Sequence, residues 1–144
     1  MRKLFLFVCL LSVLSLPAFS QQFESSITGS VYAGTTCATT GACTTLRLPL
    51  GAASASINLV ANAAFTGTVT FEASADNITF VGIPGAPAAT GTAVSTTTAA
   101  GTWRFSVSGF RYLRVRVSAY TSGRLNVFIV GSTAPLTIGA TAGP

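Results

Sequence analysis

Residues 67–74, which read GTVTFEAS, set the class of fold. Apolar and polar side chains alternate along this stretch, and a period of two is that of a β-strand with one buried face and one face in water. We therefore expect Val69, Phe71 and Ala73 to point into a core. The stretch predicts a sheet protein with alternating strands.

The same alternation recurs along the chain after residue 20, and no segment there has helical periodicity. Asp76 and Asn77 favour the turn of a hairpin after the strand at residues 67–74. Residues 84–101 are rich in Ala, Thr, Gly and Pro and predict a long loop that includes a short strand near residues 92–97. Besides residues 67–74, strands are expected at residues 46–50, 56–61, 78–83, 103–107, 113–119 and 124–130.

Short alternating strands joined by Gly-rich turns bury their apolar faces when one sheet packs on another. We predict an all-β fold, a β-sandwich of two antiparallel sheets with about seven or eight strands in a jelly-roll-like arrangement. A closed barrel is the alternative. Trp103, the lone tryptophan, shares a face with Phe105 and Val107, so we expect it to anchor the core.

The N-terminus has the three-part pattern of a secretory signal peptide. Met1-Arg2-Lys3 is positive, residues 4–16 are uncharged and mainly apolar, and small residues precede position 21. The apolar run is shorter than the roughly 20 residues that a membrane-spanning helix needs. We predict a signal peptide at 1–20, a β-sandwich domain at 21–132 and a loose C-terminal tail at 133–144, in a protein that is secreted or at the cell surface without a membrane span.

Two cysteines follow the predicted signal peptide. Cys37 and Cys43 lie close together in the segment TTCATTGACTT, and in an exported chain such a pair is most simply a disulfide. A zinc site would need more ligands than two cysteines, and the chain has no histidine. We therefore predict a Cys37–Cys43 disulfide and no metal site.

Charge is scarce, which limits the chemistry. Removal of Arg2 and Lys3 takes the formal net charge from +5 to +3, whereas a nucleic-acid binder has a denser basic surface. Without histidine, Ser-His-Asp and Cys-His catalysis cannot be built. A glycosidase would need two convergent carboxyls, and the acids are few. We expect a non-enzymatic protein with no catalytic residues, no cofactor and no nucleic-acid partner; the acids are Glu24, Glu72 and Asp76.

Residues 109–120, GFRYLRVRVSAY, concentrate arginines and aromatics in one strand. Alternation places Tyr112, Arg114, Arg116, Ser118 and Tyr120 on the face opposite the core. Arg104 and Arg124 lie nearby if the preceding and following strands pair with this one. The candidate ligand or partner face therefore consists of Arg104, Arg111, Tyr112, Arg114, Arg116, Tyr120 and Arg124.

Three interpretations of this face are open. Tyr and Arg are enriched at protein interfaces, which fits contact with another protein or self-association. Tyrosines stacking on sugar rings and arginine forks binding anionic groups fit a surface polysaccharide. The same residues are also ordinary on the exposed face of a strand. Separately, Asn77-Ile78-Thr79 matches the N-glycosylation pattern, so Asn77 is a candidate glycosylation site.

Three segments follow one another along the chain: GTVTFEASADNITFVGIPG, GTWRFSVSGFRYLRVRVSAYTSG and RLNVFIVGS. This layout, over residues 67–132, resembles a recurrent β-sandwich module of tailed-phage structural proteins, and RVRVSAY at residues 114–120 is its most distinctive part. Phe80 stands where that family often has tryptophan, the cysteine segment lies outside the match, and a signal peptide is unusual for a virion protein.

The resemblance implies a non-enzymatic structural or adhesion module. Together with the signal peptide, it favours an exported module that acts through protein contact or self-assembly at a cell or virion surface. The alternative is a carbohydrate-binding module that recognises a surface polysaccharide through the Arg/Tyr strand face.

Overall fold

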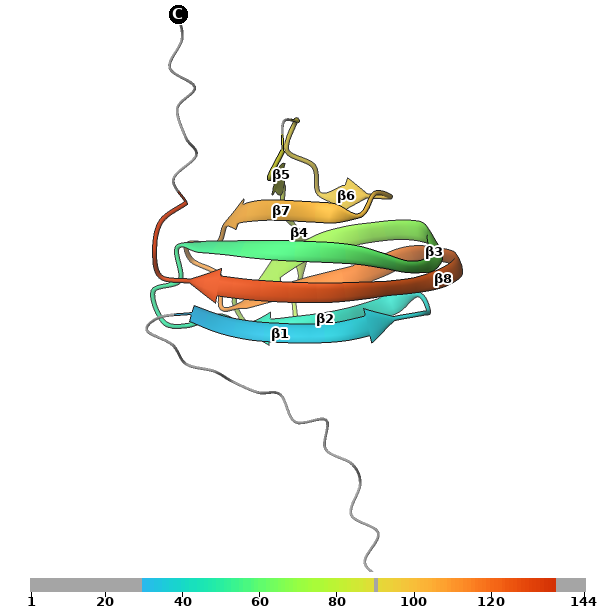
Figure 1. Cartoon of the computed structure of the whole chain (residues 1–144). Helices are drawn as coiled ribbons and strands as arrows, with labels where there is room; N and C mark the ends of the chain where they lie inside the picture. The colour runs from blue at the N-terminus through green and yellow to red at the C-terminus, as the bar shows by residue number, and fades with distance from the viewer. Residues whose placement is uncertain (1–29, 90, 137–144) are drawn as a thin grey trace, which may run out of the picture.

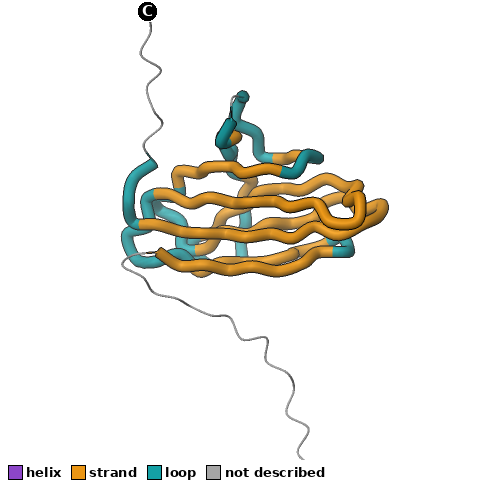
Figure 2. The backbone as a smooth tube through the Cα atoms, in the orientation of Figure 1, coloured by secondary structure: helices purple, strands orange, loops and turns teal. Residues whose placement is uncertain are grey.

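A computed structural model describes residues 30–89 and 91–136 of the chain (Figure 1). Strands dominate this part of the chain, and loops occur mainly at the strand ends (Figure 2). Within these ranges no helix is long and apolar enough to cross a membrane. The predicted signal peptide, residues 21–29 and tail residues 137–144 lie outside the described residues. The strands are β1 (Ser30–Cys37), β2 (Gly41–Arg47), β3 (Ser54–Ser74), β4 (Val81–Gly82), β5 (Ala86–Pro87), β6 (Thr96–Thr97), β7 (Gly101–Ser106) and β8 (Tyr112–Ser132).

Hydrogen bonds join all eight strands into one antiparallel sheet. Its main path runs β1-β8-β3-β7-β5, while β2 pairs with β8, and β4 and β6 pair with β3. The predicted all-β class is confirmed. The two separate sheets of a jelly-roll-like sandwich are not observed in the described part of the chain, which holds a single continuous sheet.

The single sheet results from two strands of unusual length. β3 and β8 have 21 residues each and pair with one another from end to end. Each replaces two predicted strands, because the breaks expected near Gly67 and Gly123 are bends inside continuous strands. The hairpin after β3 is confirmed, although its returning strand β4 is only 2 residues long, and β6 falls within the predicted short strand.

The long strands bend so that the sheet folds onto itself. Trp103 of β7 is in register with Ile57, 14 residues before Phe71 on β3. In a flat strand those positions would be about 45 Å apart. The rings of Phe71 and Trp103 instead have centroids 5.4 Å apart, and Phe71 and Phe105 are 5.0 Å apart. Figure 1 shows the long strands turning where the labels β3 and β8 stand, so that one part of the sheet lies behind the other.

The bend has a defined backbone geometry. Three residues of β3, at positions 63–65, face the single residue Gly123 of β8. Ala63 and Ala64 both have a φ of 50°, and Gly123 has a φ of 82°. A Cβ on Gly123 would lie 2.5 Å from the Ala63 carbonyl oxygen and from the Phe65 nitrogen. The close approach of the two strands therefore requires glycine at this position.

The two strands keep the same buried face on both sides of the bend. The extra residues of β3 are compensated by extra residues of β8 at two nearby register shifts, between Thr66 and Gly67 and between Thr68 and Val69. Alternate residues therefore point into one core before and after the bend. Its largest fully buried side chains are Phe71, Phe105, Ile57, Leu59, Leu113, Leu125, Ile129, Val69, Val107, Val115, Val117 and Val127, and Trp103, 5% exposed, joins them as predicted.

The predicted disulfide between Cys37 and Cys43 is present, with the two Cα atoms 5.6 Å apart. It links the end of β1, where Cys37 faces Leu125, to the start of β2, where Gly41 faces Val117. Both partner positions lie close to the bend of β8. The covalent link therefore joins the outermost strands of the two parts of the folded sheet and, on a chain-entropy estimate, stabilises the fold by roughly 2 kcal/mol.

Replacing Gly123 with alanine tests the bend. The matched control is Gly109→Ala, because Gly109 also has a positive φ, +89°, but a Cβ there would meet nothing within 4 Å. We expect Gly109→Ala to lower the free energy of unfolding by about 1–2 kcal/mol, the cost of a left-handed alanine. Gly123→Ala adds a backbone clash and should cost on the order of 3–5 kcal/mol. Urea unfolding of both variants measures the difference, and equal losses would contradict the close approach.

Candidate functional site

The predicted Arg/Tyr stripe lies on the outer face of the first half of β8, between β2 and the second half of β3. Tyr112 is in register with Ser74 on one side and Arg47 on the other, and Arg114 is in register with Glu72 and Thr45. The residues that meet on this surface form what we call the arginine face: Arg47, Glu72, Tyr112, Arg114 and Arg116.

Glu72 holds the centre of the arginine face. Its Oε2 accepts hydrogen bonds from Arg114 Nε at 2.8 Å and Nη2 at 2.6 Å, and its Oε1 accepts one from Arg116 Nε at 2.8 Å. Glu72 is only 7% exposed, although it lies on the outer face of the sheet. The guanidinium carbon of Arg114 also lies 3.6 Å from the centre of the Phe80 ring. Both carboxylate oxygens and the face of one guanidinium are therefore already occupied within the chain.

The protonation of the two described carboxyls follows from these contacts. Burial by itself raises the pKa of Glu72, but hydrogen bonds and charge attraction from Arg116 and Arg114 outweigh it and lower the pKa below the ordinary 4.5. Hydrogen bonds from the backbone N–H groups of Ile78 and Thr79 lower the pKa of Asp76 to about 2. Asp76 is therefore the acceptor that orders the turn after β3, and both carboxyls are ionised at neutral pH.

Tyr120 does not lie on the arginine face, and this part of the predicted stripe is wrong. Its ring packs against the core, with its centroid 6.3 Å from that of Phe65, and its hydroxyl donates to the Gly123 carbonyl oxygen at 3.0 Å. The cause is the register shift at Ser118, where β8 has one extra residue and the alternation of faces is displaced. Tyr120 is therefore part of the bend.

The other predicted arginines are also placed elsewhere. Arg104 on β7 is in register with Ser56, in the first half of β3, and Arg124 is in register with Asn62 at the bend. Arg111 comes just before β8, and its Nε is buried without a hydrogen-bond partner among the described residues. The seven predicted residues therefore do not form one surface. The structure adds Arg47, which only the pairing of β2 with β8 brings beside Tyr112.

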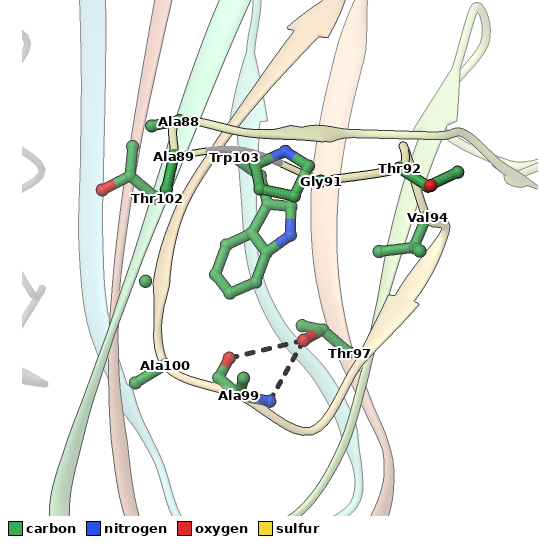
Figure 3. Close-up of a pocket in the computed structure, with 12 residues that line it drawn as sticks. Ala88, Ala89, Gly91, Thr92, Val94, Thr97, Ala99, Ala100, Thr102 and Trp103 are labelled. Atoms are coloured by element: carbon green, nitrogen blue, oxygen red, sulfur yellow. Dashed lines mark hydrogen bonds between the residues drawn. The ribbon is translucent and has the colours of Figure 1, made fainter.

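The loop before β7 lines an open pocket of about 570 Å³, to which Trp103 also contributes (Figure 3). The described lining is uncharged and consists mainly of alanines, threonines and Pro87. One of its hydroxyls is engaged, because Thr97 Oγ1 accepts a hydrogen bond from the Ala99 N–H at 3.0 Å. Across the described residues no three His, Cys, Asp or Glu side chains gather as metal ligands. Asn77, the candidate glycosylation site, lies exposed in the turn after β3 with a φ of 64°.

No family model matches the sequence, and no curated protein matches it at a significant level. Two solved structures have a similar fold. The SPBc2 prophage-derived protein YomS superposes with a TM-score of 0.57 at 17% identity, over 74% of this chain and 97% of YomS. The PBSX exported protein XepA superposes with a TM-score of 0.59 at 17% identity, over 90% of this chain and 49% of XepA, so the chain spans about half of that protein.

These similarities show the fold alone: the chain has the fold of phage-related β proteins. The predicted resemblance to phage proteins is confirmed to that extent. A role in a virion stays a prediction.

The ion-pair cluster predicts a defined response to acid. Because the folded-state pKa of Glu72 is lowered, its contribution to stability is present above its ordinary pKa of 4.5 and is lost as the pH falls through the lowered value. We expect Glu72→Gln to lower the free energy of unfolding at pH 7 by about 2–4 kcal/mol, because two arginines lose their shared acceptor. The variant should also lose less stability than the wild type between pH 5 and pH 3, measured by urea unfolding.

Asp76→Asn is the control. An asparagine retains the oxygen that accepts from Ile78 and Thr79, so only the part of the acid response between the ordinary 3.8 and about 2 should change. Identical pH profiles for wild type and Glu72→Gln would show that the cluster contributes nothing to stability.

Proposed function

We propose that the chain is an exported structural module that works through contact with another protein or with further copies of itself, without catalysis. The main support is an antiparallel sheet whose outer strands β1 and β2 each pair, in the described structure, only with β8. Unpaired backbone groups along such strands are a template for pairing with another chain. The low charge of the sequence favours close contact.

Two further observations support the proposal. Both described carboxyls are engaged, Glu72 by arginines and Asp76 by backbone N–H groups, and the chain has no histidine. This leaves little with which to build an acid–base pair. The similar protein XepA is described as exported, which agrees with the predicted signal peptide of this chain.

Self-association of the oxidised protein, residues 21–144, tests this function. We expect light scattering to show a mass that rises with protein concentration above that of a monomer. The mass should be unchanged between about 50 mM and 500 mM salt, because a backbone and apolar contact is not screened by ions. A monomer at every concentration would remove self-association, and dissociation by salt would point to the arginine face as the contact.

A carbohydrate-binding function is the second candidate, and the arginine face favours it. Arg47, Arg114 and Arg116 contribute three positive charges against the single charge of Glu72, which leaves a net +2 beside the half-buried ring of Tyr112. Arg116 has 38% of its side chain exposed. Such a surface fits an anionic polysaccharide with sugar rings that stack on the tyrosine.

Tyr112→Ala tests this second function. We expect the variant to bind a sulfated polysaccharide more weakly by on the order of 1–3 kcal/mol, by analogy with rings that stack on aromatic side chains. Arg104→Ala is the matched control, because Arg104 lies outside the arginine face and should not affect binding. Isothermal titration gives both values. Equal affinities for wild type and Tyr112→Ala would rule out the tyrosine as a platform.

A further inference from the structure

The outer strands of the sheet differ in how well they are protected against pairing with other chains. Natural edge strands are commonly short, bulged, or supplied with proline or charge. The strands β4, β5 and β6 have 2 residues each, and β5 contains Pro87. β2 has a register irregularity between Ala42 and Thr44 and ends at the charged Arg47.

β1 has none of these protections. It runs for 8 residues, SVYAGTTC, without proline or charge. Its register with β8 is unbroken from the Ser30–Ser132 pair to the Cys37–Leu125 pair. Among the described strands, β1 is therefore the long, regular and uncharged edge.

We propose that β1 is the surface through which two copies of this chain associate, with β1 of one copy pairing antiparallel to β1 of the other. This inference rests on the proposed function and names its contact surface. An antiparallel pair of identical strands is related by a two-fold axis, so the same segment is offered and received. Because β1 is uncharged, no like charges meet along the two strands.

The structure holds β1 ready for such pairing. β8 pairs with it along its whole length, and the disulfide fixes its last residue, Cys37, to Cys43. A strand that is already ordered loses little conformational entropy on association. The described outer face of β1 has small residues: Gly34 is exposed, and the exposed Thr36 donates from its hydroxyl to Asn126 Oδ1 at 2.8 Å.

A pair of lysine variants tests the edge. Phe128 of β8 is in register with Gly34 of β1 on one side and with Asn58 of β3 on the other. Gly34 and Asn58 are both exposed, but only Gly34 is on the edge strand. We expect Gly34→Lys to raise the dissociation constant for self-association at least tenfold, because it places a charge near the centre of both paired strands. Asn58→Lys, with the same charge one strand inward, should stay within about twofold of wild type.

Light scattering over a concentration series gives the dissociation constants, and circular dichroism shows that both variants are folded. Hydrogen exchange on the wild type adds a readout that needs no substitution. Amides of β1 should exchange at least tenfold more slowly at an associating concentration than in dilute solution, while amides of β2 should not change.

The outcomes separate the edge from the broader function. Pairing through β1 would be overturned if Gly34→Lys had the same dissociation constant as the wild type, or if Asn58→Lys raised it as much as Gly34→Lys does. Self-association itself would still stand in either case. A wild-type protein that stays monomeric, with β1 exchange independent of concentration, would overturn both the edge and the proposed self-association.

Discussion

The continuous pairing of β3 with β8 is the constraint on which the rest of the structure depends. Each of these strands crosses the bend, so the register on one side of Gly123 fixes the register on the other. The same ladder aligns Ile57 with Ile129 in the first half and Glu72 with Arg114 in the second. The shorter strands pair onto β3 or β8, except β5, which pairs with β7. The bend is therefore the position where a single added methyl group would disturb both halves at once.

Because the paired strands β3 and β8 bend back, the apolar faces of the two halves of the sheet are buried against each other. Before the bend closes, the inner faces of both halves would be in water, and closure brings Phe71 against Trp103 and Phe105. On the outer face of the second half, the carboxylate of Glu72 is largely removed from water. The loss of its hydration costs free energy unless other groups bind the charge. Hydrogen bonds from Arg114 and Arg116 supply that compensation, and Phe80 covers one guanidinium. The arginines are thus first a structural element, and only their remaining charge is available to a ligand.

The sequence predicts local features of this fold well, because strand faces are a local property. Alternation correctly assigned Val69, Phe71 and Trp103 to the core, and the spacing of the two cysteines correctly predicted their bond. Strand ends were predicted less well. Gly123 is compatible both with a hairpin turn and with a bend inside a strand, and only its contact with residues 63–65 decides between them.

The candidate site failed where it depended on long-range register. One extra residue at Ser118 displaces the alternation, and Tyr120 turns inward although its neighbours in sequence suggest otherwise. Arg47 is far from the stripe in sequence and enters the arginine face through the pairing of β2 with β8. The partner of Glu72 is likewise set by a pairing that spans 42 residues. The alternation of residues within one strand does not predict which residues of other strands lie beside it.

The two surfaces proposed for function belong to different parts of the folded sheet. β1 pairs with the second half of β8, whereas the arginine face is built on its first half. Association through β1 would therefore leave Arg47, Tyr112 and Arg116 uncovered by the strand pairing itself. The dimer would present two arginine faces, and two weak sites held on one assembly bind a repetitive polymer far more tightly than either alone. The two proposed functions are thus compatible in this fold, because the backbone edge of β1 would serve self-association and the remaining positive charge of the arginine face would serve polysaccharide contact.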